Sequence, residues 1–250
     1  MINQATHLKD RPILEARDLK KSFGSLQALK GISFEVYPGE IFALIGPNGA
    51  GKTTTLRIIA TILKPYSGDV RLAGCSVVKQ PEKVRELITH LPEDAGAYKN
   101  MTGREYLIFM ASLYLEERDE VQKAVEMAEQ ITDLGKRLDT RIATYSKGMM
   151  RKLLLARALM VKPELAILDE PTSGLDVVNA LEIRKTIKRF VAAGMSVLLS
   201  SHNMLEVEFL SDRVAIINHG EILETGTPAE LKERYGTKNL EEVFEVVSGK

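Results

Sequence analysis

The eight residues from Gly46 to Thr53 have the types and spacing most capable of chemistry in this chain. They read Gly-Pro-Asn-Gly-Ala-Gly-Lys-Thr, follow the apolar run 41–45 and open a stretch with helical spacing. This is the G-x-x-x-x-G-K-[ST] pattern in a strand–loop–helix context. The glycines let the backbone curl so that N–H groups point at phosphate oxygens, and the following helix adds its positive dipole end. The loop therefore predicts a nucleoside triphosphate bound with Mg²⁺.

Two side chains of the loop have separate tasks in this prediction. Lys52 would reach the β- and γ-phosphates, and the Thr53 hydroxyl would ligate Mg²⁺. The alternative is a glycine-rich turn with no ligand, and the flanking strand and helix disfavour it. We assign nucleotide contacts to Gly46, Pro47, Asn48, Gly49, Ala50, Gly51, Lys52, Thr53 and Thr54.

A pair of carboxylates, Asp169 and Glu170, follows the apolar run 165–168. If this strand and the strand before the loop are parallel neighbours, both strand ends lie at the same edge of the sheet, where α/β proteins bind ligands. Asp169 then suits Mg²⁺, and Glu170 suits a base for the attacking water. An acidic pair that is merely solvated is the alternative, and the phosphate loop makes it the weaker one.

The elements that must position these residues alternate between strands and helices. Short strands are indicated at 13–16 and 32–37 by alternating apolar and polar residues. After a helical block, the pattern continues with a strand at 165–168, a helix at 180–193, a strand at 197–199 and a hairpin at 214–223. Strands that alternate with helices predict a parallel sheet.

The helical block begins at Thr102, which forms a capping box with Glu105, and ends near Gly135. A second capping box at Thr227 begins what we expect to be the last helix, with Gly236 past its end. Between the block and the strand at 165–168, the residues Tyr145-Ser146-Lys147-Gly148-Met149 precede another helix. Ser146 either only caps this helix or binds a phosphate at its N-terminus.

Composition limits the other possibilities. The 250 residues contain 34 Lys+Arg and 34 Asp+Glu, so the formal net charge of zero argues against a dedicated nucleic-acid binder. Cys75 is the single cysteine, which excludes an internal disulfide. The segment Met1–Leu8 lacks the apolar core of a signal peptide, and no run of about eighteen apolar residues could span a bilayer. We therefore expect a cytoplasmic protein that reaches a membrane only through a partner.

Taken in order, these motifs resemble the ATPase subunit of an ATP-binding cassette (ABC) transporter over residues 12–235. Phe23 resembles the family's adenine-stacking aromatic, although a core aromatic is the alternative. Glu93 occupies the Q-loop position, and His202 occupies that of the switch histidine, although a structural histidine is the alternative. The matching segments are the Walker A loop 46–53, the signature 145–149, the Walker B strand 165–170 and the D-loop 173–176.

The resemblance implies an α/β fold of the P-loop NTPase (RecA-like) type. It has a parallel-sheet core, an N-terminal antiparallel β subdomain and an inserted α-helical subdomain. The ATPase domain would span 12–235, with 12–95 and 160–235 as the β subdomain and core, 96–159 as the helical subdomain and 236–250 as a short extension. ATP and Mg²⁺ are implied. The implied catalytic residues are Glu170, His202 and Lys52; metal contacts fall to Thr53, Glu93 and Asp169, and further nucleotide contacts to Ser146, Gly148 and Asp176.

The resemblance also implies partners. Two ATPase subunits, identical or paralogous, would each complete the other's site, on an integral membrane subunit at the inner face of the cell membrane. The family's usual glutamine is Glu93 here, and three of five signature residues differ. Both departures resemble a subgroup of drug, sodium and oligosaccharide exporters. Two rival functions are a soluble ABC-type ATPase acting on DNA or the ribosome and a nucleotide-binding regulator without turnover.

Overall fold

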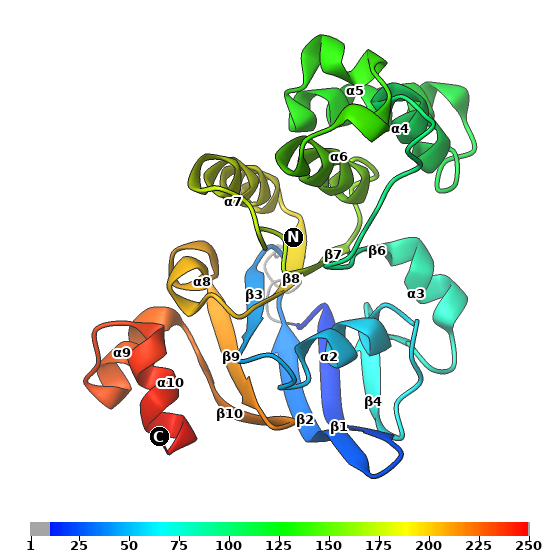
Figure 1. The fold of residues 1–250 in the computed structure, drawn as a ribbon. Helices are drawn as coiled ribbons and strands as arrows, with labels where there is room; N and C mark the ends of the chain where they lie inside the picture. The colour runs from blue at the N-terminus through cyan, green and yellow to red at the C-terminus, as the bar shows by residue number, and fades with distance from the viewer. Residues whose placement is uncertain (1–10, 250) are drawn as a thin grey trace, which may run out of the picture.

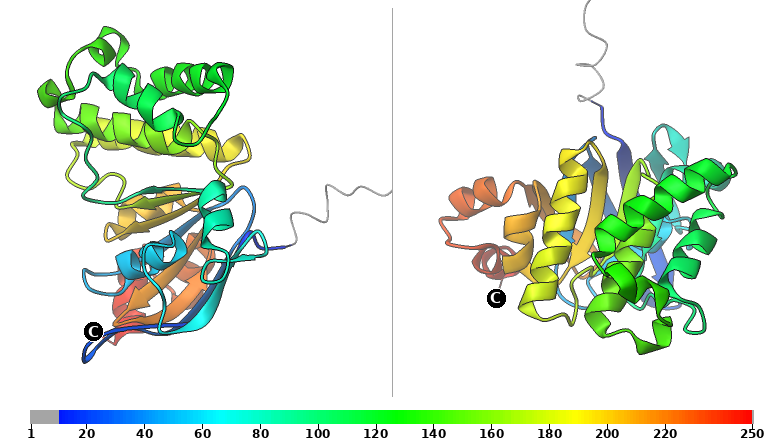
Figure 2. Two further views of the ribbon diagram at one scale, coloured as in Figure 1. Left: turned by 90° about the vertical axis from the view of Figure 1, so that its right-hand side faces the viewer. Right: turned by 90° about the horizontal axis from the view of Figure 1, so that it is seen from above.

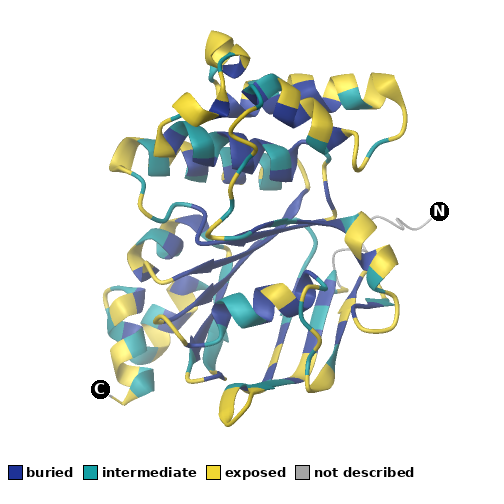
Figure 3. Ribbon diagram, turned by 45° about the vertical axis from the view of Figure 1, so that its right-hand side comes forward, coloured by how far each residue is buried: buried dark blue, intermediate teal, exposed yellow. Residues whose placement is uncertain are grey.

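The computed structural model describes residues 11–249, in which two sheets and their helices form one molecule (Figure 1). The segment Met1–Leu8, on which the expectation about a signal peptide was based, lies outside the described residues. The outer surfaces of the helices are largely exposed, whereas the inner strands of the larger sheet are buried along most of their length (Figure 3). The larger sheet therefore lies at the centre of the fold.

This larger sheet has six strands in the order β10-β9-β3-β8-β7-β6, and all pairs are parallel except β9 with β10. The predicted parallel sheet is thereby confirmed. The expectation that β3 and β7 are direct neighbours is wrong, because β8 lies between them. The bounds are β3 Ile41–Ile45, β6 Ile88–Leu91, β7 Leu165–Asp169, β8 Ser196–Ser201, β9 Arg213–Asn218 and β10 Glu221–Gly226.

Strand β3 shows how the sheet separates two cores. All five of its residues are buried, and successive side chains point to opposite faces. Ile41, Ala43 and Ile45 belong to the core that the helices on one face complete. Phe42 and Leu44 belong to the core on the other face, where Phe42 stacks on Phe34 at 5.4 Å. A continuous apolar run is thus the signature of a strand covered on both sides.

The second sheet has the order β2-β1-β4-β5 and is antiparallel, which confirms the predicted N-terminal β subdomain. Its first two strands are longer than the sequence indicated, because register shifts between Ala16 and Leu19 interrupt the simple alternation. The bounds are β1 Leu14–Phe23, β2 Leu26–Val36, β4 Ser67–Leu72 and β5 Cys75–Ser76, with α2 Lys52–Ile59 and α3 Pro81–Leu87 nearby.

The remaining helices cover the other face of the central sheet and extend away from it at one end (Figure 2). The Thr102–Glu105 capping box is present at the start of α4, which confirms the predicted helix start. Whether the boundaries at 96 and 159 delimit a subdomain stays a prediction. The bounds are α4 Gly103–Ala111, α5 Arg118–Thr132, α6 Lys147–Leu159, α7 Val177–Ala192 and α8 Met204–Leu210.

At the C-terminal end, α9 spans Pro228–Tyr235 between the predicted cap Thr227 and Gly236. The expectation that this helix is the last one is wrong, because a further helix, α10, spans Leu240–Ser248. The Asn239 side chain accepts a hydrogen bond from the backbone N–H of Glu242, and Leu240 and Val243 are buried against the rest of the fold. No helix within residues 11–249 is long and apolar enough to cross a membrane.

Candidate active site

The loop between β3 and α2 has a backbone that requires glycine. Gly49 and Gly51 have φ values of 80° and 114°, in the left-handed region that favours glycine. A Cβ on Gly51 would lie 2.7 Å from Leu29 Cδ2, and one on Gly46 would lie 2.0 Å from the carbonyl oxygen of Ile217. The loop therefore packs tightly on one side. The N–H groups of Gly46 and Ala50 donate to protein carbonyl oxygens, whereas those of Asn48, Gly49 and Gly51 donate to no acceptor among residues 11–249 and suit a phosphate cradle.

Lys52, the first residue of α2, is 5% exposed. Its ammonium donates to the carbonyl oxygens of Gly46 at 2.7 Å and Pro47 at 3.2 Å, and lies 3.7 Å from a carboxylate oxygen of Glu170. Burial lowers the pKa of Lys52, while the nearby carboxylates oppose that shift. A buried cation of this kind is stabilised by a further anion, so its surroundings favour phosphate binding.

The residues at the end of β7 fit a magnesium ion. The Thr53 hydroxyl donates to Oδ1 of Asp169 at 3.3 Å, and the Ser200 hydroxyl donates to the same oxygen. Asp169 is 1% exposed. A hydroxyl and a carboxylate oxygen at this separation are oxygen ligands of the type Mg²⁺ prefers beside substrate phosphates. Thr53 and Asp169 are thus the residues that would hold Mg²⁺, with charge neutralisation as the chemistry it supplies.

Glu170 and His202 lie side by side at the ends of β7 and β8. Nδ1 of His202 is 2.8 Å from Oε1 of Glu170, and the Ser201 hydroxyl donates to Oε2 at 3.4 Å. Glu170 is 5% exposed, whereas the His202 side chain is 49% exposed. His202 is therefore not packed in the core as a structural histidine would be. A buried carboxylate that has a histidine as its partner suits proton abstraction from water.

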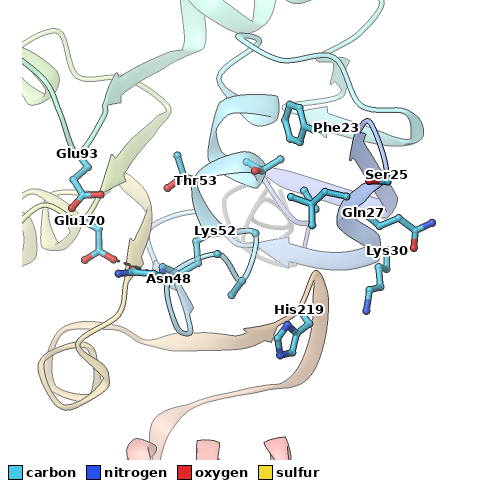
Figure 4. A pocket seen from close by; sticks show the side chains of 16 residues that line it. Phe23, Ser25, Gln27, Lys30, Asn48, Lys52, Thr53, Glu93, Glu170 and His219 are labelled. Atoms are coloured by element: carbon cyan, nitrogen blue, oxygen red, sulfur yellow. Dashed lines mark ion pairs between the residues drawn. The ribbon is translucent and has the colours of Figure 1, made fainter.

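A cleft of about 650 Å³ lies next to the loop (Figure 4). Figure 4 shows Glu93 and Glu170 on one side, Phe23 on the other, and Lys52 and Thr53 between them. The Phe23 ring is 48% exposed, so it is not the core aromatic that composition allowed. The Lys21 ammonium lies over the ring, 5.2 Å from its centroid, and the stacking of Phe23 against a base stays a prediction. The predicted residues that line the cleft are Phe23, Asn48, Gly49, Ala50, Gly51, Lys52, Thr53, Thr54, Glu93 and Glu170.

Sequence reasoning missed several residues of this cleft. His219, in the turn between β9 and β10, lies at its edge because Gly220 donates to the Ala50 carbonyl at 2.9 Å. The turn was predicted, but no local signal indicated that it contacts the phosphate loop, since about 170 residues separate them. Ser25, from the turn between β1 and β2, and Gln27 and Lys30, from β2, also line the cleft.

Glu93 follows β6 and faces the cleft from its own loop. One of its carboxylate oxygens accepts a hydrogen bond from the Ser173 hydroxyl at 3.3 Å. This hydrogen bond joins the Q-loop position to the D-loop segment. The two are far apart in the sequence, which gave no sign of the contact. Glu93 does not contact Thr53 or Asp169 through any hydrogen bond within residues 11–249, so its assignment as a metal contact stays a prediction.

Ser146, Gly148 and Asp176 do not line the cleft around Lys52. Ser146 caps α6, where its hydroxyl accepts from the N–H of Met149 at 3.2 Å, and Asp176 caps α7 by accepting from Asn179 at 3.0 Å. The hydrogen bonds from Asn179 lower the pKa of Asp176. Gly148 lies against the same residue, since a Cβ there would be 2.7 Å from Asn179. Ser146 thus caps its helix as the first alternative expects, and its predicted phosphate contact stays a prediction.

The sequence and the fold both match known proteins. The ABC transporter family matches residues 29–173. The linearmycin resistance ATP-binding protein LnrL of Bacillus subtilis is 38% identical over 90% of this chain and 72% of its own length. The daunorubicin/doxorubicin resistance ATP-binding protein DrrA of Streptomyces peucetius is 36% identical over 91% of this chain and 69% of its own. The protein NatA of B. subtilis, an ABC transporter ATP-binding protein, is 34% identical over 88% and 89%.

Among solved structures, an ATP-binding subunit of an ABC transporter aligns with a TM-score of 0.86 and 29% identity, covering 94% of this chain and 99% of that one. The ADP conformation of the ATP-binding cassette MJ1267 aligns with a TM-score of 0.78 and 26% identity, covering 95% of each chain. The family match, the relatives and the geometry of the cleft agree. The chain therefore belongs to the ABC transporter family, as an ATPase subunit that binds ATP with Mg²⁺.

Proposed function

We propose that this chain supplies the energy for an exporter whose membrane-spanning part is a separate subunit. The observation that carries the proposal is the position of Glu170, between Lys52 and His202 beside the phosphate loop. A base there can orient water towards a phosphate that Lys52 and the loop amides hold. The export role is supported by two relatives named for resistance to linearmycin and to daunorubicin or doxorubicin.

A second ATPase subunit, identical or paralogous, completes each site in this proposal. Ser146 and Gly148 lie outside the cleft that Lys52 lines, so within one chain they do not face the same space. A second subunit placed head to tail brings its own Ser146 to the phosphate. ATP then stabilises the pair because it contacts both subunits, and hydrolysis weakens that contact.

The surface for the membrane subunit lies in the segment after Glu93. Sequence alone did not separate exposed from buried aromatic residues there. Tyr106 is 2% exposed and belongs to the core, whereas Tyr98 and Phe109 are exposed and pack edge to face at 5.7 Å. Exposed aromatic side chains that touch each other are typical of protein interfaces. The proposed location is the inner face of the cell membrane, where this partner holds the chain.

The experiment is co-purification of the tagged chain from detergent-solubilised membranes of its own cells, with identification of what comes with it. We expect an integral membrane protein. Replacing Tyr98 by Ser should reduce its recovery, because the aromatic contact is lost. Tyr66→Ser is the matched control, since Tyr66 is also exposed but lies in the turn before β4.

Two outcomes would contradict the proposal. One is recovery of ribosomes or nucleic acid in place of a membrane protein, which would favour the soluble ATPase. The other is an equal loss of the membrane protein with Tyr98→Ser and Tyr66→Ser, which would place the contact elsewhere. The net charge of zero makes the first outcome unexpected.

A further inference from the structure

Arg151 is a buried cation that no sequence motif explains. It lies in α6, is 7% exposed, and has no carboxylate within ion-pair distance among residues 11–249. Burial lowers the pKa of Arg151 for the same reason that it is costly to bury any charge. Other groups must compensate for the free-energy cost of burying the guanidinium. If α6 needed only packing at this position, an apolar side chain would serve as well.

The hydrogen bonds of the guanidinium all go to backbone carbonyl groups at the site, and the charges of Glu93, Asp169 and Glu170 add to this compensation. The guanidinium donates to the carbonyl oxygens of Pro171 at 2.7 Å, Asp169 at 3.0 Å and Glu170. It also donates to those of Glu93 at 3.2 Å and Pro92 at 3.4 Å. These five acceptors equal the five N–H donors of a guanidinium. One side chain thus joins α6, the Glu93 loop and the end of β7.

Glu170 needs such support because its backbone is strained. Its φ of 48° lies in the left-handed region, and the next residue is Pro171, which disfavours helical conformations in the residue before it. A non-glycine residue in this conformation costs about 1–3 kcal/mol and persists only where its surroundings fix it. Here the N–H of Glu170 donates to the Ser200 carbonyl at 3.2 Å, and the carbonyl accepts from Arg151 and from Ser173.

We propose that Arg151 is a positioning residue for ATP hydrolysis. It fixes the left-handed backbone of Glu170, and with it the direction of the carboxylate, and it ties that direction to the Glu93 loop and to the helix that follows Ser146. This rests on Glu170 acting as the base, but it needs neither the membrane subunit nor the export role. A shift of α6 or of the Glu93 loop then changes the position of Glu170 through the same guanidinium.

The test compares Arg151→Lys, Arg151→Gln and Arg151→Met with Arg157→Gln in the purified chain. Lysine keeps the charge but cannot reach both loops with one compact ammonium. Arg157 is the matched control, since it lies in the same helix and donates to a single carbonyl, that of His90, at 2.8 Å. The measurements are kcat and KM for Mg-ATP, the Kd of a fluorescent ATP analogue, and the thermal midpoint.

We expect the Arg151 variants to keep the wild-type Kd while kcat falls on the order of 10²-fold, the effect of a misplaced catalytic group. Arg157→Gln should retain both. Wild-type kcat in Arg151→Lys and Arg151→Gln would overturn the proposal. So would variants in which nucleotide binding and the thermal midpoint are lost together with kcat, because Arg151 would then be only structural. A wild-type chain that hydrolyses ATP but pairs with no membrane protein would contradict the export role and leave this result intact.

Discussion

The carboxylate of Glu170 has two basic side chains beside it, and each affects its action as a base in a different way. Lys52 at 3.7 Å stabilises its charge, whereas His202 at 2.8 Å offers a partner through which a proton could pass. Neither contact is visible in the sequence, where the three residues are far apart. They meet because β3, β7 and β8 end at one edge of the sheet, which the alternation of strands and helices does predict.

Glu93 stands where the family resemblance implies a glutamine. A carboxylate there can accept a hydrogen bond from metal-bound water but cannot donate one, and its charge repels phosphate. We therefore expect Glu93→Gln to bind ATP more tightly and to change kcat by less than about tenfold, or about 1.4 kcal/mol. The Ser173 hydroxyl can still donate to the amide oxygen.

Titration with an ATP analogue and steady-state phosphate release measure both effects. Asp94→Asn is the control, because it removes an adjacent exposed carboxylate that does not line the cleft. A loss of kcat well beyond tenfold in Glu93→Gln, with Asp94→Asn unchanged, would show that the carboxylate itself is required.

Among the elements, those specified by local signals were predicted well and those specified by distant contacts were not. The capping boxes at Thr102 and Thr227 each lie within four residues, and both helices begin where the sequence indicates. The insertion of β8 between β3 and β7 depends on pairing between distant segments. Helix α10 was missed because its capping residue Asn239 follows a C-terminal glycine signal that read as the end of the fold.

The loop before α2 offers a comparison of two glycines that share a conformation but not an environment. A Cβ on Gly51 would meet Leu29 and Ala28 at 2.7 and 2.9 Å, whereas one on Gly49 would meet nothing within 4 Å. Gly49→Ala should lose about 1–2 kcal/mol of unfolding free energy from the left-handed backbone alone. Gly51→Ala should lose about 1–3 kcal/mol more, because the core must shift to make room.

Urea unfolding of the nucleotide-free proteins measures this difference directly, without interference from lost phosphate contacts. Equal losses of unfolding free energy in the two variants would contradict this prediction. They would mean that the Leu29 side chain moves aside without loss of stability and that the close packing of the loop does not fix its conformation.

One molecule of this chain contains only half of the ATP site that we propose for the dimer. The cleft contains the groups that hold phosphate and activate water, while Ser146 and Gly148 lie at the start of α6, outside it. The order of the motifs indicated this arrangement, and the fold gives it a physical reason. Which partner chain supplies the second half cannot follow from the sequence of one subunit, because the contact depends on two surfaces.

The most direct test of this account is the mass of Glu170→Gln in solution with and without Mg-ATP, measured by light scattering during gel filtration. Loss of the base should lower hydrolysis by about 10²–10⁴-fold while leaving the phosphate contacts in place. We therefore predict a dimer with Mg-ATP and a monomer without it. Lys52→Ala in the same background should stay monomeric, because it removes the phosphate contact. A Glu170→Gln chain that binds ATP yet remains a monomer would contradict the shared site.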